Sequence, residues 1–117
     1  MKVKIQDKEI QLFYTMRMMI IYENITGESV DFMDMKSVKQ LSTLLLACII
    51  ASAKKQQIEF NITYDEYADW LDDNGGYVML NNFATWLANE IQAKYSLLAE
   101  KEEKEDELPK SRKKAKG

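Results

Sequence analysis

The stretch VKQLSTLLLACIIASAKK, from Val38 to Lys55, carries the clearest structural signal in the sequence. Its apolar residues recur at the three- and four-residue intervals that place side chains on one face of a helix. A second stripe holds the small residues Ala47 and Ala51, which allow another helix to approach closely. The basic pair that ends the stretch suits the negative end of the helix dipole. The stretch therefore predicts a long helix packed against other helices. Its apolar stripe consists of Val38, Leu41, Leu44, Leu45, Cys48, Ile49 and Ser52.

A second apolar helix is predicted before this one. Thr15 is a typical helix N-cap, and Gly27 is a typical stop. The residues between them are apolar on nearly every side, which predicts a central buried helix. Three of the 7 methionines of the chain fall here, as Met16, Met18 and Met19. Methionine fills irregular gaps in a core, and it also adapts to the surface of a partner.

The chain opens with alternating apolar and polar residues, which is typical of a β-hairpin. Val3 and Ile5 precede a polar turn at residues 7–9, and the alternation resumes at Ile10 and Leu12. A lone hairpin is marginally stable in water. We therefore expect its apolar face to lie on the helices.

Two further helices are predicted towards the carboxyl end. Thr63 and Glu66 form a capping box, in which each side chain satisfies a free backbone amide of the other residue. The short helix that they start extends to about residue 72, where an Asp-Asn-Gly-Gly turn ends it. The last helix is expected from about Val78 past Leu98.

The sequence thus predicts a mainly α fold: a four-helix domain with a small N-terminal β-hairpin and a charged C-terminal tail. Residues 1–99 form the helical domain. Residues 100–117 form the charged extension, which we expect to be disordered after Pro109 because apolar residues disappear there.

Charge is distributed unevenly along the chain. Residues 1–99 hold 9 Lys and Arg against 13 Asp and Glu, a net charge of −4, and residues 100–117 hold 7 against 6, a net charge of +1. An acidic body repels a phosphate backbone, which disfavours nucleic acid as a partner of the folded part. The basic end from Lys110 to Lys116 has no aromatic residue to stack on a base, so any binding to nucleic acid there would be nonspecific.

Residue types argue against an enzyme. The chain has no histidine, which removes histidine-dependent triads and the commonest metal ligand. Cys48 is the only cysteine, and its place on an apolar helix face predicts a protonated, structural thiol. A calcium loop starting at Asp72 would put Tyr77 where glycine is needed and Phe83 where glutamate is needed. We therefore predict no catalytic residue, no metal ligand and no cofactor.

The apolar segments are too short for a membrane protein. The longest apolar run, from Leu44 to Ala51, is far below the roughly 18 residues that span a bilayer. The N-terminal residues lack the pattern of a signal peptide. Since a single cysteine also allows no internal disulfide, we expect a cytoplasmic protein.

Several motifs, taken in order, resemble the tail assembly chaperones of long-tailed (siphovirus-like) phages and prophages. The hairpin at residues 1–12 leads into a helix that ends Tyr-Glu-Asn-Ile-Thr-Gly at residues 22–27. A Leu/Ala-rich helix follows at residues 41–53, and the third helix starts with Ile-Thr-Tyr-Asp-Glu at residues 62–66. Order and spacing agree over about residues 1–98.

The resemblance implies a function in virion assembly. Such proteins are made in the host cytoplasm, where they bind the tape-measure protein and keep its apolar helical segments soluble. They also help to recruit tail-tube subunits, and they are absent from the finished particle. Many exist in a short form and in a longer form produced by ribosomal frameshifting. The charged extension departs from a generic member of the family.

The sequence places a binding surface on the two apolar helices, because together they carry more apolar area than a four-helix domain easily buries. Self-association through the same surface stays open. Two other functions also stay open: a nucleic-acid-associated regulator that uses the basic tail, and a structural component of the virion. The predicted partner-binding residues are Met16, Met19, Ile20, Leu45 and Ile49, and the alternative that these residues belong entirely to the core also stays open.

Overall fold

The computed structural model describes residues 1–32 and 37–107, with side chains described up to residue 97. The chain divides into two compact units, Met1–Trp86 and Leu87–Gly117. The division falls within the last helix, whereas charge composition placed a boundary after residue 99. The predicted disorder after Pro109 concerns residues outside the described part of the chain.

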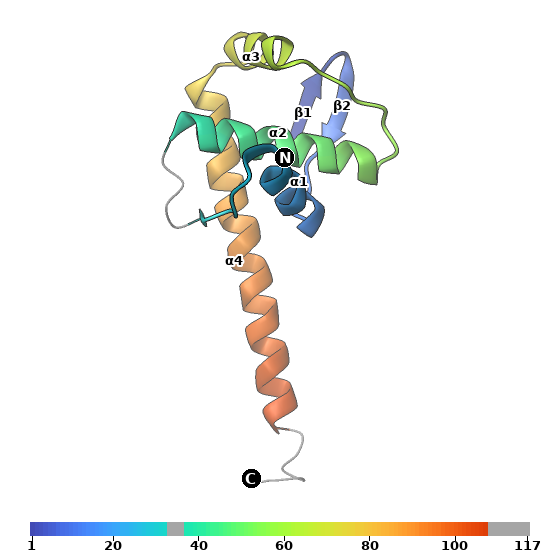
Figure 1. The fold of residues 1–117 in the computed structure, drawn as a ribbon. Coiled ribbons are helices and arrows are strands. Elements are labelled where there is room, and N and C mark those ends of the chain that lie inside the picture. Colours follow the sequence, from blue (N-terminus) through green and yellow to red (C-terminus); the bar gives the residue numbers. More distant parts are fainter. Residues whose placement is uncertain (33–36, 108–117) are drawn as a thin grey trace. The chain divides into compact units, whose positions relative to one another are not determined.

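Figure 1 shows the elements in chain order. The described residues form four helices and one antiparallel two-stranded sheet, which confirms the predicted mainly α fold with an N-terminal hairpin. No helix in this part of the chain is both long and apolar enough to cross a membrane. The elements are β1 (Lys2–Ile5), β2 (Lys8–Gln11), α1 (Met16–Thr26), α2 (Val38–Lys55), α3 (Tyr64–Asp73) and α4 (Tyr77–Glu107).

The hairpin turn lies at Gln6 and Asp7, so the prediction of a turn at residues 7–9 is wrong. Both turn residues have positive φ angles, 54° and 60°. Two such residues make a type I′ turn, whose twist matches that of the flanking strands. This register places Val3 opposite Ile10, and both side chains are buried as predicted.

The first helix begins and ends where the sequence predicted. The Thr15 hydroxyl accepts a hydrogen bond from the Met18 amide, and Gly27, at φ 76°, donates its amide to the Glu23 carbonyl. However, α1 is not the central buried helix that the sequence predicted. Its only buried residues are Met18 and Tyr22, so the helix covers the core with one side.

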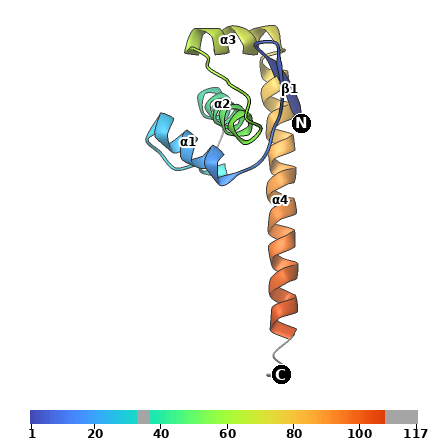
Figure 2. The same cartoon turned by 90° about the vertical axis from the view of Figure 1, so that its right-hand side faces the viewer.

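The central helix is α2. Figures 1 and 2 both show it between α1 and α3. Most of its residues from Leu44 to Ala53 are buried. Ser37 and Gln40 cap its start with a reciprocal pair of hydrogen bonds, which the sequence analysis did not identify.

Polar side chains of α2 fix the chain that leaves β2. The Phe13 amide donates to the Ser52 hydroxyl over 2.9 Å, and the Cys48 thiol donates to the Phe13 carbonyl over 3.4 Å. One turn further on, the Gln56 side chain bonds both backbone groups of Gln11. These residues recur every fourth position and therefore form one polar stripe along the helix. The stripe satisfies backbone groups that a two-stranded sheet would leave unpaired.

Candidate protein-binding surfaces

The described residues include one cysteine, Cys48, which is buried. Among them, no cluster of three or more His, Cys, Asp or Glu residues could hold a metal ion. Burial raises the pKa of the Cys48 thiol to about 12, and the hydrogen bonds to Ser52 and Phe13 offset this only in part. The thiol therefore stays protonated near neutral pH and is a structural group.

The structure separates the five predicted partner-binding residues into two sets. Met16 and Ile20 are 71% and 55% exposed, and Met19 is half-buried. Leu45 and Ile49 are completely buried. These two residues belong to the core because α2, rather than α1, is the central helix. The folded protein therefore cannot present them to a partner.

Met16, Met19 and Ile20 form a continuous apolar surface that we call the α1 face. Their spacing of three and four residues places them side by side on the helix. Arg17 and Glu23, both exposed, flank them on the same side of the helix. The opposite side of α1 is anchored in the core, so the α1 face is an apolar surface on a fixed helix.

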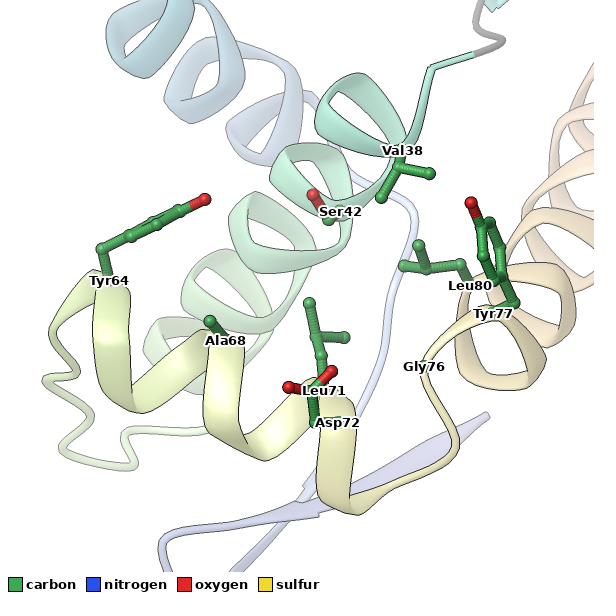
Figure 3. A pocket seen from close by; sticks show the side chains of 9 residues that line it. All are labelled: Val38, Ser42, Tyr64, Ala68, Leu71, Asp72, Gly76, Tyr77 and Leu80. Atoms are coloured by element: carbon green, nitrogen blue, oxygen red, sulfur yellow. The ribbon is translucent and has the colours of Figure 1, made fainter.

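A second surface lies around α3, entirely within the unit Met1–Trp86. It is a hollow of about 280 Å³ between the start of α2, one side of α3 and the start of α4. We call it the α3 groove. Figure 3 shows Tyr64 at one end and Tyr77 at the other, with Ala68 and Leu71 between them. The lining residues are Val38, Ser42, Tyr64, Ala68, Leu71, Asp72, Gly76, Tyr77 and Leu80.

Hydrogen bonds hold the wall of the α3 groove in place. The Tyr67 hydroxyl donates to the Ser42 carbonyl over 2.6 Å, which ties α3 to α2. The Trp70 indole donates to the Lys4 carbonyl over 2.7 Å, which ties α3 to the hairpin. Burial raises the pKa of Tyr67, so this hydroxyl keeps the proton that it donates.

The start of α3 is fixed by the capping box that the sequence predicted. Thr63 accepts from the Glu66 amide over 3.1 Å, and Glu66 accepts from the Thr63 amide over 2.8 Å. These two hydrogen bonds, first to the backbone and then to the side chain of Thr63, lower the pKa of the Glu66 carboxyl. The capping box therefore sets where Tyr64, the first helical residue, stands at the end of the groove.

The surface of α3 is strongly acidic. All five of its carboxylates are exposed, and no salt bridge of theirs is found within the described residues. From Gln56 to Ala93 the sequence has no Lys or Arg. The acidic surface therefore has no compensating positive charge on its own helix. The carboxylates are those of Asp65, Glu66, Asp69, Asp72 and Asp73.

The sequence analysis missed the α3 groove. Tyr64, Tyr67, Ala68 and Leu71 recur at the spacing of one helix face, and such an apolar face predicts a helix side packed on the core. In the structure Tyr67 is buried, whereas Tyr64 is 80% exposed. One signal in the sequence could have indicated the groove. The apolar face of this short helix is too wide for all of its side chains to pack on a single neighbouring element. Periodicity alone does not show which part of such a face meets the core.

No protein-family model, no curated protein and no solved structure matches this chain. Its resemblance to the tail assembly chaperones therefore depends on the ordered motifs of the sequence.

Proposed function

We propose that this protein is a tail assembly chaperone of a long-tailed phage or prophage. It would act in the cytoplasm of the bacterial host, bind the tape-measure protein and help to recruit tail-tube subunits. Two kinds of evidence support the proposal: the ordered motifs of residues 1–98, and an exposed apolar surface on α1.

The observation that carries the proposal is the α1 face. Met16 and Ile20 are neighbours on one helix, and each exposes more than half of its surface. Large apolar side chains grouped on a surface favour contact with a partner. Methionine adds a flexible, polarisable side chain that can fit apolar helices of different sequence.

The size of this surface suits a reversible contact. Full burial of Met or Ile contributes about 1.5–3 kcal/mol each. Association and the ordering of side chains offset most or all of that gain, so contacts beyond these two residues must add to the affinity. The α1 face alone therefore favours a partner that is bound and then released, which is the behaviour of an assembly chaperone.

Co-expression with the tape-measure protein of the same tail-gene cluster tests the proposal. We expect the chain to raise the soluble fraction of that protein and to co-purify with it. Met16→Ser combined with Ile20→Ser should abolish both effects. Leu97→Ser is the matched control, because Leu97 is also largely exposed and lies outside the α1 face.

A second measurement separates an assembly chaperone from a structural component. Mass spectrometry of purified particles should detect tail-tube and tape-measure proteins but not this chain. Stoichiometric presence in the particle would contradict the proposal, as would the absence of any binding to the tape-measure protein in the co-expression test.

A further inference from the structure

We propose that the α3 groove is a second docking site, which takes a basic amphipathic helix of a partner protein. One bulky apolar side chain of that helix enters the hollow, and its Lys or Arg side chains lie against the acidic surface of α3. This inference relies on the proposed function only in taking the ligand to be a protein, and it concerns a surface other than the α1 face.

The size and lining of the hollow favour a side chain as its occupant. Pockets for small molecules and cofactors usually start at about 300 Å³ and enclose most of their ligand. This hollow, at about 280 Å³, is only about as large as the smallest of these pockets. Val38, Ala68, Leu71 and Leu80 give it apolar walls, which a Leu or Phe side chain would cover.

The two tyrosines at the ends of the hollow fit a protein interface. Tyr64 and Tyr77 are 80% and 70% exposed, so neither ring is part of the core. Tyrosine is enriched among the residues that dominate binding, because it offers a large, rigid contact surface with a polar end. A helix laid across the hollow would bury both rings.

The charge pattern of α3 identifies the partner as basic. Asp65, Asp69 and Asp72 recur at intervals of four and three residues and therefore form one stripe, about 10 Å long. Asp72 also lines the groove, so the stripe borders the hollow directly. Exposed ion pairs are individually weak, but such a stripe repels acidic partners and speeds encounter with basic ones.

The repeat of the acidic stripe favours a helix over an extended segment. Lys or Arg residues spaced by three and four positions lie on one side of a helix. Their distances along the helix axis then match those between the three aspartates of α3. An apolar residue on the neighbouring side of that helix would then face the hollow. Helices commonly dock in this way, with a few apolar anchors in a groove.

Fluorescence anisotropy with the full chain tests the proposal. The probe is a fluorescein-labelled amphipathic helix of about 15 residues, with leucines on one side and lysines beside them. We expect saturable binding that weakens as salt rises, because exposed charges are screened. The same peptide with every Lys replaced by Glu should not bind.

Substitutions then place the peptide on the groove. Tyr64→Ala combined with Tyr77→Ala should raise Kd at least about tenfold. Tyr95→Ala, which removes a tyrosine that is 64% exposed and lies outside the groove, should leave Kd unchanged. Asp69→Asn should raise Kd about two- to fivefold, and Glu23→Gln, which removes the same charge from α1, should not.

Three results would overturn the proposal. The first is equal binding of the Lys and Glu peptides. The second is binding that the paired tyrosine substitution leaves intact. The third is concentration-dependent self-association in sedimentation, abolished by that substitution, which would assign the groove to a second copy of the chain.

The outcome is independent of the tape-measure experiment. Peptide binding at the groove without any effect of the chain on the tape-measure protein would remove the proposed function and leave this inference standing. If the chain binds the tape-measure protein through the α1 face alone and does not bind the peptide, the proposed function stands and this inference is removed.

Discussion

Ser52→Ala, a change of one oxygen atom, is expected to destabilise the unit Met1–Trp86 measurably. Ser52 is completely buried, and its hydroxyl accepts the Phe13 amide over 2.9 Å. Removal of one partner leaves the other without a hydrogen bond, at a cost of about 1–3 kcal/mol when that group is buried. The Phe13 amide is only part-buried, so we expect about 1–2 kcal/mol.

The assay is urea unfolding, monitored by tryptophan fluorescence. Trp70 and Trp86 both belong to the unit Met1–Trp86, so the signal reports on that unit. In a parallel thermal unfolding scan, a loss of this size should lower the midpoint by at least about 4 °C in a domain of this length. Ser29→Ala is the matched control, because Ser29 is exposed. If the free energies of unfolding of both variants lie within about 0.5 kcal/mol of that of the parent protein, the hydrogen bond does not contribute to stability as proposed.

Three other perturbations test separate parts of the structure. Cys48 should resist alkylation in the native protein at pH 8 and react on unfolding. Because its pKa rises from 9.0 to about 12 on folding, its contribution to the free energy of unfolding should be fully present below pH 9 and should fall as pH rises from 9 towards 12. Denaturation measured over this pH range should show the fall, and Cys48→Ala should reduce it. Gly27→Ala should lower the free energy of unfolding by about 1 kcal/mol, since its φ of 76° strains any side chain although space is free around it. The capping hydrogen bonds lower the pKa of Glu66 in the folded state, so its contribution to the free energy of unfolding is fully present above the ordinary pKa of 4.5. This contribution should be lost as pH falls through the folded-state pKa, and Glu66→Gln should remove the pH dependence.

Helix limits could be predicted from the sequence because local chemistry sets them. Thr15 and Gly27 bound α1, and Thr63 with Glu66 starts α3, as expected from capping. Capping depends on groups within a few residues of each other, so no knowledge of tertiary structure is needed. The hairpin turn was placed wrongly because polar residues on both sides of Asp7 made more than one register plausible.

The exposed apolar surfaces were harder to predict than the helix limits, because they depend on what covers each helix. Met16 and Leu45 are both apolar residues on apolar helices, yet the first is 71% exposed and the second is buried. The sequence pattern gives the width of an apolar face and not the side that packs on the core. The α3 groove also needs parts of three helices, separated by 42 residues between Val38 and Leu80, to meet in space.

Hydrogen exchange with and without the tape-measure protein tests the proposed chaperone function most directly. In the complex, amides of α1 that follow Met16 and Ile20 should exchange more slowly than in the free chain, because a bound partner covers the α1 face. A stoichiometric complex in which α1 exchanges at the rate of the free chain would contradict the assignment of the α1 face as the tape-measure binding surface.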